Sequence, residues 1–497
     1  MAVPGRRTDA RRRAALAAAA ALPVLLLPAC TAGGGGPVPT QVATAARSAT
    51  PLSAGDWTTY HRDPARTGVA PGAAPVRSLT RAWSAALDGA VYGQPLVVGA
   101  RVLAATENNT LYGLDAASGA VLWSTHLGPP ATAAELPCGN IDPLGITGTP
   151  VYDPSSGLVY AVAELSGGRH ELAGLDAATG AVVVRREVEP PKGDPLAHQQ
   201  RAALTLLDGR VVVAFGGLFG DCGTYVGSVL AVPATGAGPI LSYAVPTARE
   251  GGIWAAGGPV VDGGRLLVSV GNGAETSGTN QGSDSVLALA LPSSLPSSLT
   301  TSLPPSPSPS LTTSLPPSPS PSTELVRTDF FAPSSWQQDN ADDLDLGSLS
   351  PVRVGRFVLA VGKRGTGYVL DAAHFGGVGG ELSQAALCPA YGGAAVTGST
   401  VYLPCQDQLL QVTVGDDGRL GTGWRLPLRG AGSPVVGGGA VWVLDYGQGR
   451  LYALDPADGR VLEQTAVGPV PHFAAPVLTG GRVLVGTMAG VTAFGTD

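Results

Sequence analysis

The chain has 497 residues, of which 44% are hydrophobic and only 13% are charged, and its formal net charge is -7. This length and composition suit one large β domain or two ordinary domains. No basic stripe occurs beyond the N-terminus, so the charge pattern argues against a nucleic-acid partner. The 71 glycines and 43 prolines are typical of many short strands joined by turns.

The N-terminal residues 1–30 have the anatomy of a secretory signal. Clustered arginines precede the apolar run Ala14–Leu27, which is too short to span a membrane. The run leads into Leu-Pro-Ala-Cys at residues 27–30, which resembles the bacterial lipoprotein signal box. We therefore expect a lipid-modified Cys30 that anchors the exported protein on the extracytoplasmic face of a bacterial membrane. A plain signal peptide and an uncleaved anchor are the alternatives, and both the general and the twin-arginine export routes stay open.

Residues 31–55 are rich in Gly and Thr and show no periodicity, which predicts a flexible tether. The remaining residues, 56–497, carry recurrent strand patterns and are predicted to form the folded domain. No further segment is apolar enough, over enough residues, to indicate a second membrane span.

One phrase recurs along this domain, at residues 113–119, 174–180 and 453–459, and in weaker form at 230–236. Alternating apolar residues precede and follow it, which predicts a strand, a turn and a strand in each repeat. We interpret the shared residues as turn structure, because an Asp carboxylate caps backbone N–H groups and Gly supplies a positive φ. Each Asp belongs to a different repeat, which argues against a shared metal ion. These turn residues are Asp115, Gly119, Asp176, Gly180, Asp455 and Gly459.

A second element, a short strand of small residues that ends at a Gly turn, opens each repeat. Six copies lie at residues 93–99, 148–153, 258–263, 350–355, 433–438 and 475–480, and two degenerate copies at 201–209 and 391–398. Small residues suit strands that crowd a central axis. Eight units spaced by about 40–55 residues predict an all-β fold, an eight-bladed β-propeller of four-stranded antiparallel blades.

The two ends of the repeat array predict how the ring closes. Residues 81–87 match the outer strand at 122–127, yet they precede the first inner strand. The last unit stops at Phe494, where an outer strand should follow. We therefore expect the N-terminal strand near residues 80–87 to complete the last blade and leave no open edge.

The repeat resembles that of a known family. The segment Gly113–Trp123 contains the whole pattern Gly-x-Asp-x-x-Ser-Gly-x-x-x-Trp, which is similar to the repeat of pyrroloquinoline-quinone (PQQ)-like β-propellers. Residues 56–68 also resemble the lead-in of such propellers in bacterial secreted proteins. The family includes quinoprotein alcohol dehydrogenases and the lipoprotein scaffold of the outer-membrane protein assembly machine. The resemblance covers roughly residues 56–497 and implies the fold, while the chemistry of its members is divided between enzymes and scaffolds.

An insertion interrupts the fourth blade. Residues 298–309 are repeated in full at 310–321, and the tract consists largely of Pro, Ser, Leu and Thr. Such a composition cannot build a core, so we expect a disordered Pro/Ser-rich insertion over residues 291–325. The blade is predicted to resume at Val326.

The cysteines agree with export. Apart from Cys30 there are four, an even number that suggests two disulfides in an extracytoplasmic protein. A hairpin returns Cys405 to the lead-in that holds Cys388, and that pairing leaves Cys138 with Cys222. Free buried thiols are the alternative. The spacing fits no zinc site.

Loops that enter each blade, and loops between its second and third strands, are expected to gather on one face of a propeller. The candidate binding rim there consists of His198, Gln199, Arg201, Trp254, Asn272, Glu275, Asp339, Asp342, Asp343, Asp345, Lys363, Arg364 and His472. The acidic residues favour a solvated turn over a calcium loop, because the ligand order of a known loop is missing. Lys363 and Arg364 suit an anion clamp or the flanks of a tight turn. For His198 and His472 a surface or capping role is favoured over catalysis.

No HExxH, P-loop, CxxC or GxSxG motif occurs, so no catalytic residue is predicted. We expect a monomeric, non-enzymatic scaffold lipoprotein that binds a protein, a peptide or an envelope polymer, with no metal or cofactor. The alternative that the resemblance implies is a PQQ-dependent alcohol dehydrogenase with a calcium ion. Glu275, Asn272 and one carboxylate of residues 339–345 are its candidate ligands, although no adjacent cysteine pair occurs. A hydrolase or lyase acting on an extracellular polymer ranks third.

Overall fold

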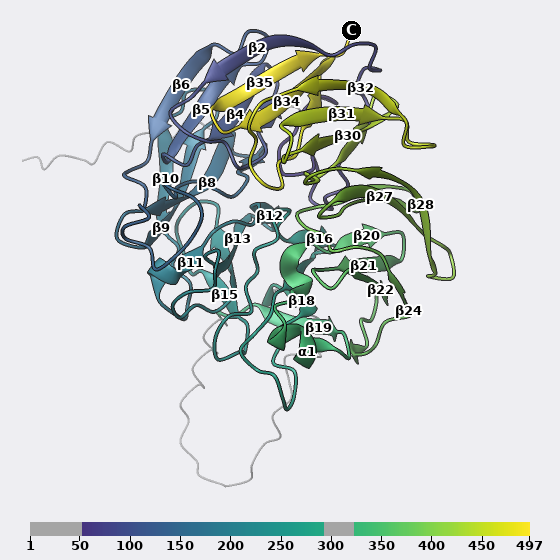
Figure 1. Ribbon diagram of the computed structural model, residues 1–497. Helices are drawn as coiled ribbons and strands as arrows, with labels where there is room; N and C mark the ends of the chain where they lie inside the picture. Colours follow the sequence, from purple (N-terminus) through teal and green to yellow (C-terminus); the bar gives the residue numbers. More distant parts are fainter. Residues whose placement is uncertain (1–51, 293–322) are drawn as a thin grey trace, which may run out of the picture. The chain divides into compact units, whose positions relative to one another are not determined.

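Eight antiparallel sheets follow one another along the chain and form an eight-bladed β-propeller (Figure 1). The computed structural model describes residues 52–292 and 323–497. The predicted signal peptide, most of the predicted tether and the repeated part of the predicted insertion lie outside these described residues. Among the described residues, no helix combines the length and the apolar character that crossing a membrane requires.

Each blade has four main strands in sequential antiparallel order, numbered outward from the axis. The first four blades are β3 (Leu96–Val98), β4 (Arg101–Ala105), β5 (Thr110–Asp115) and β6 (Val121–His126); β7 (Val151–Asp153), β8 (Leu158–Leu165), β9 (Arg169–Asp176) and β10 (Val182–Glu187); β12 (Thr205–Leu207), β13 (Arg210–Gly217), β14 (Ser228–Pro233) and β15 (Leu241–Ala244); and β16 (Val260–Asp262), β17 (Arg265–Val270), β18 (Ser285–Ala290) and β19 (Val326–Ala332).

The next three blades and the first three strands of the eighth complete the order. They are β20 (Val352–Val354), β21 (Phe357–Val361), β22 (Thr366–Asp371) and β24 (Ser383–Ala386); β25 (Ala395–Thr397), β26 (Thr400–Pro404), β27 (Gln408–Val414) and β28 (Leu420–Pro427); β29 (Val435–Gly437), β30 (Ala440–Asp445), β31 (Arg450–Leu454) and β32 (Val461–Ala466); and β33 (Val477–Thr479), β34 (Arg482–Thr487) and β35 (Gly490–Gly495). Short elements are β1 (Val69–Ala70), β11 (His198–Gln199), β23 (Gly377–Val378), α1 (Trp336–Ala341), η1 (Pro195–Ala197) and η4 (Leu346–Ser348).

The ring closes as the sequence predicted. The outer strand of the eighth blade is β2 (Thr80–Ala86), which pairs antiparallel with β35 and places Ala86 opposite Gly490. Figure 1 shows this purple N-terminal strand beside the yellow C-terminal strands. Because the last blade borrows its edge from the start of the domain, the two ends of the array are joined by a full ladder of hydrogen bonds.

Outer strands also contact the following blade through tryptophan. The indole Nε1 of Trp123, on β6, donates to the carbonyl oxygen of Ala177 at 3.2 Å, across the boundary between the first and second blades. Trp83 makes the same contact with Ala116, and Trp424 with Pro456. The motif that repeats along the chain therefore repeats a blade-to-blade contact as well as a turn.

Residues 56–70, here called the axial segment, run through the centre of the ring. The indole of Trp57 donates to Leu478 of the eighth blade at 2.7 Å. Main-chain hydrogen bonds tie the segment to the first, second, fourth, sixth and seventh blades, and Arg66 Nη2 donates to Leu204 at the start of the third at 2.9 Å. Those main-chain contacts are Trp57 with Val97, Thr58 with Tyr152, Pro64 with Val261, Thr67 with Val396 and Gly68 with Val436.

Much of the axial segment is buried although it is rich in polar side chains. His61 is fully buried, and Arg66 is 5% exposed. Burial lowers the pKa of His61 to about 3, so its imidazole is neutral at physiological pH. The segment lies toward the turns between first and second strands, because Asp56 Oδ1 accepts from Gly99 in one of those turns at 2.9 Å. We call this end of the ring the turn face, and the opposite end the entry face.

Candidate functional site

The centre of the entry face carries a group of aromatic side chains from five blades, all half-buried except the exposed His472. Tyr391 and Phe473 are stacked, with ring centroids 5.9 Å apart and planes 9° apart, and Trp254 lies 6.3 Å from Phe473. Tyr446 contacts His472 at 4.8 Å. The axial aromatic cluster, as we call it, comprises Tyr92, Trp254, Tyr391, Tyr446, His472 and Phe473.

Arg201 is the cation at the middle of this cluster. Its guanidinium lies 5.8 Å from the ring centroid of Tyr92 and 5.7 Å from that of Phe473, and Nη2 donates to the carbonyl oxygen of His472 at 3.1 Å. Arg201 is only 8% exposed. Among the described residues, no carboxylate lies within 4.0 Å of its nitrogens. A buried guanidinium with unused donors is suited to an anionic group.

Two buried carboxyl groups lie behind Arg201, and sequence reasoning missed both. Glu107 Oε2 accepts from Gly145 N at 2.8 Å and from Thr147 Oγ1 at 3.0 Å, while its Oε1 has no hydrogen-bond partner among the described residues. Burial raises the pKa of Glu107 to about 7. Glu164 accepts from the backbone N–H of Gln200 at 2.6 Å, and burial raises its pKa well above the usual value. Their only sequence signal is a charged residue among strand and loop residues.

Lys363 sits at the edge of the cluster in an ion-paired group. Its Nζ lies 2.6 Å from Asp345 Oδ2, 2.8 Å from Asp343 Oδ1 and 5.9 Å from the ring centroid of Trp254. Burial opposes the charged form of the lysine, but Asp345 outweighs it and raises the pKa of Lys363. Lys363 is therefore engaged by this chain's own carboxylates, unlike Arg201.

The acidic segment departs from the sequence expectation. A solvated turn was expected, but Asp339 and Asp345 are 2% and 4% exposed. Residues 336–341 fold as α1, which buries Trp336 and directs Asp339 toward Arg364, its ion-pair partner. The expectation was wrong for these two carboxylates because they are paired with Lys363 and Arg364, in the loop between β21 and β22. Asp342 and Asp343 are exposed.

The other predicted rim residues have mainly structural contacts. His198 is 1% exposed, its Nδ1 lies 2.8 Å from the carbonyl oxygen of Asp194, and burial lowers its pKa. Gln199 lies beside it in β11 and is 8% exposed. Asn272 donates its backbone N–H to Asp345 Oδ1 at 2.6 Å. Glu275 accepts from Ala248 N at 2.7 Å.

The turn residues of the repeat lie away from this cluster, at the turn face. Asp115 Oδ1 accepts from the backbone N–H groups of Ala117 at 3.1 Å and Ser118 at 2.8 Å. Asp176 makes the same pair of contacts, and Asp455 Oδ1 accepts from Ala457 N at 3.0 Å. The glycines that close the three turns have φ between 73° and 74°.

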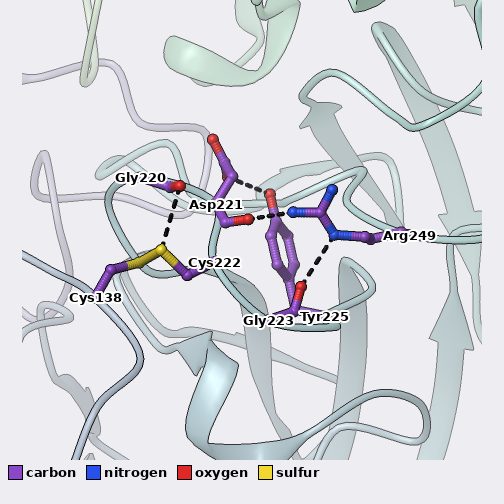
Figure 2. The surroundings of a disulfide bond; sticks show 7 residues. All are labelled: Cys138, Gly220, Asp221, Cys222, Gly223, Tyr225 and Arg249. Carbon is purple, nitrogen blue, oxygen red and sulfur yellow. Dashed lines mark hydrogen bonds between the residues drawn. A yellow bond between two sulfur atoms is a disulfide. The ribbon is translucent and has the colours of Figure 1, made fainter.

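Two disulfides reinforce the entry face, with the pairing expected from the sequence. Cys138 pairs with Cys222, with Cα atoms 5.9 Å apart, and Cys388 with Cys405, with Cα atoms 5.7 Å apart. Each links a loop that enters a blade to a loop between second and third strands. Figure 2 shows the first pair together with the side chains that hold its loop.

The sequence matches the family model described as outer membrane protein assembly factor BamB over residues 80–261 and 334–496. The chain belongs to this PQQ-like β-propeller family. The unmatched stretch between the two segments contains the Pro/Ser-rich insertion. No curated protein matches the chain significantly in sequence.

Solved structures of this family share the fold at low sequence identity. Quinohemoprotein alcohol dehydrogenase ADHIIG from Pseudomonas putida HK5 superposes with a TM-score of 0.66 at 16% identity, covering 89% of this chain and 80% of that one. The enzyme from Comamonas testosteroni gives 0.63 at 17% identity, over 89% and 80%. BamB from Moraxella catarrhalis gives 0.55 at 16% identity, over 84% and 99%.

The PQQ-like dehydrogenase alternative needs a calcium ion, and two of the carboxylates offered to it already have partners within this chain. The carboxylate of Glu275 is engaged by Thr247 and Ala248, and Asp345 is held by the ammonium group of Lys363. Among the described residues, no group of three or more His, Cys, Asp or Glu side chains could hold a metal ion. Glu275 and Asp345, two of the ligands proposed from the sequence, would therefore have to exchange these partners for a calcium ion.

Proposed function

We propose that this PQQ-like propeller is a non-enzymatic binding lipoprotein whose entry face takes up a protein, a peptide or an envelope polymer. The observation that carries the proposal is Arg201, a nearly buried guanidinium that makes a single hydrogen bond within the described residues, to His472. Aromatic rings on both sides favour a cation that is desolvated yet still able to donate. An acidic group on the bound molecule would satisfy the donors that the protein leaves unused.

The surroundings of Arg201 support binding from the entry face. The axial segment fills the centre of the ring toward the turn face, so it separates Arg201 from that end. Half-buried aromatic rings around Arg201 supply large contact areas at low conformational cost. The cations beside them, Lys363 and Arg364, are paired with carboxylates of this chain and contribute little net charge. The result is a platform for recognition with one strongly placed cation.

The proposal extends to the location of the protein. A lipid on Cys30 would tether the propeller to the extracytoplasmic face of a bacterial membrane, and the disulfides suit such an oxidising compartment. Replacing Cys30 with Ala tests this part. We expect the wild-type chain, but not the Cys30→Ala variant, to incorporate a labelled fatty acid supplied to the producing bacterium; a wild-type chain without the label would refute the lipid anchor.

Site-specific cross-linking in the producing bacterium tests the binding role. Benzoylphenylalanine in place of Tyr391 puts the reactive group in the axial aromatic cluster, and the same group in place of Leu122 puts it on outer strand β6, where the side chain is 52% exposed. We expect a discrete adduct only from position 391. Identical patterns from both positions, or no adduct from 391, would contradict the proposal.

A further inference from the structure

A large aromatic side chain, that of Phe219, projects from the entry face. Phe219 is 69% exposed, although its neighbour Leu218 is 2% exposed and packs with Ala131 and Leu144. Phe219 lies in the loop between β13 and β14, in the third blade. Burial of a Phe side chain is favourable, but isolated exposed apolar residues are common. Exposure alone therefore does not identify Phe219 as a binding residue. The structure of the loop that carries Phe219 provides the further evidence.

The loop of residues 218–224 is held from three directions (Figure 2). The disulfide with Cys138 ties Cys222 to the loop that enters the second blade. Arg249 Nε donates to the carbonyl oxygen of Gly223 at 3.0 Å, and its Nη2 donates to that of Asp221. Tyr225 Oη donates to Asp221 Oδ1 at 2.5 Å. Phe219 is close in sequence to the residues that make these contacts, so the contacts also hold the backbone of Phe219 in place.

The backbone conformation of the loop also keeps the aromatic ring of Phe219 pointing outward. Gly220 and Gly223 have φ of 99° and 74°, and Asp221 has 51°, which places three residues of the loop in the left-handed region. A non-glycine residue in this region is costly and persists only where surrounding contacts enforce it. The same contacts that enforce this path keep Leu218 inward and Phe219 outward.

The two cross-linked loops have a one-sided charge. Residues 132–144 and 218–224 contain the carboxylates of Glu135, Asp142 and Asp221 and no Lys or Arg. Arg249, which clamps the loop, is itself ion-paired with Glu250. The exposed ring therefore projects from an acidic border.

We infer that Phe219 is the anchor with which this face docks a folded protein domain whose apolar pocket is bordered by basic residues. The inference rests on the proposed binding function and identifies the kind of partner. Interface energy concentrates in a few buried aromatic anchors, and an anchor fixed beforehand loses little entropy on binding. The acidic border favours a basic rim on the partner and disfavours an acidic membrane surface.

Benzoylphenylalanine at position 219 of the full-length chain identifies the partner in the producing bacterium, with position 488 as control. Met488 is 42% exposed and lies in the loop between β34 and β35 of the same face. We expect one protein adduct from 219, cross-linked at an apolar site flanked by Lys or Arg, and none from 488. Absence of an adduct at 219, the same adduct at both positions, or cross-linking to lipid or to a second copy of this chain would overturn the inference.

Affinity for the purified partner completes the test. Phe219→Ser should weaken binding about tenfold or more while the disulfide, near-ultraviolet circular dichroism and Tm are retained. Joint replacement of Cys138 and Cys222 by Ser keeps the ring but frees the loop, so it should weaken binding by a smaller factor. Unchanged affinity of the Phe219→Ser protein would overturn the inference. If position 391 cross-links a partner while 219 does not, the proposed function stands and this inference fails; if neither does, both fail.

Discussion

The indole of Trp123 on the first blade lies against Gly180, the glycine that closes the repeat turn of the second blade. A Cβ at position 180 would lie 2.5 Å from Trp123 Cε3. The same relationship joins Trp83 to Gly119. The closing glycine therefore serves two purposes, since it gives the turn its positive φ and leaves room for the tryptophan of the preceding blade.

This double role predicts the effect of Gly180→Ala. A methyl group there meets both the unfavourable φ of 74° and the Trp123 ring, and should lower the free energy of unfolding by about 2–4 kcal/mol. Gly157→Ala is the matched control, because its φ is 71° and a Cβ would meet nothing within 4 Å. Urea denaturation should show a smaller loss for the control. Equal losses would mean that the tryptophan contact contributes nothing.

The axial segment predicts a second stability effect. Trp57 is fully buried and hydrogen-bonded to the eighth blade, so Trp57→Ala should lower the free energy of unfolding by about 3–5 kcal/mol. Phe219→Ala removes an exposed ring and should change it by no more than about 0.5 kcal/mol. Guanidinium denaturation of both variants checks this. A Trp57→Ala protein as stable as the Phe219→Ala protein would show that the axial segment does not hold the ring.

Much of the fold was predictable because its signals are local. Turn glycines, Asp caps and apolar alternation recur within a few residues of each other, and their period gave the blades and the closing strand β2. The central path of the axial segment was not predictable, because its contacts join residues as far apart as Trp57 and Leu478. Loop order placed Arg201 and Lys363 on the correct face. It could not show that Lys363 is neutralised by Asp345 while Arg201 is not, since that depends on side-chain packing between blades.

Glu107 predicts a pH dependence of stability. Burial raises its pKa in the folded protein from the ordinary 4.5 to about 7. Between pH 4.5 and pH 7 the folded state therefore keeps a proton on Glu107 that the unfolded state has lost. The contribution of Glu107 to stability is therefore largest below pH 4.5 and falls as the pH rises to about 7, by roughly 3 kcal/mol at most.

Glu107→Gln replaces the titrating carboxyl group with a neutral amide while keeping the shape of the side chain. Relative to the wild type, the variant should become progressively more stable between pH 5 and pH 7, as measured by urea denaturation across that range. Parallel curves for the two proteins would show that Glu107 is already ionised at pH 5 in the folded state.

The enzymatic alternative is tested with PQQ and calcium added to the purified protein. Because the carboxylates offered for calcium are satisfied by Lys363, Thr247 and Ala248, we expect no dye-linked oxidation of primary alcohols above a sample that lacks the protein. Sustained turnover that depends on both additions would replace the binding role with a dehydrogenase.

The central claim is that Arg201 and the surrounding rings bind an acidic group from outside the protein. The most direct measurement is the yield of the adduct at position 391 when Arg201→Met is introduced, compared with Arg425→Met, which removes the same charge from the exposed outer strand β28. We expect the adduct to be lost with Arg201→Met and retained with Arg425→Met. Equal yields in the two proteins would contradict it.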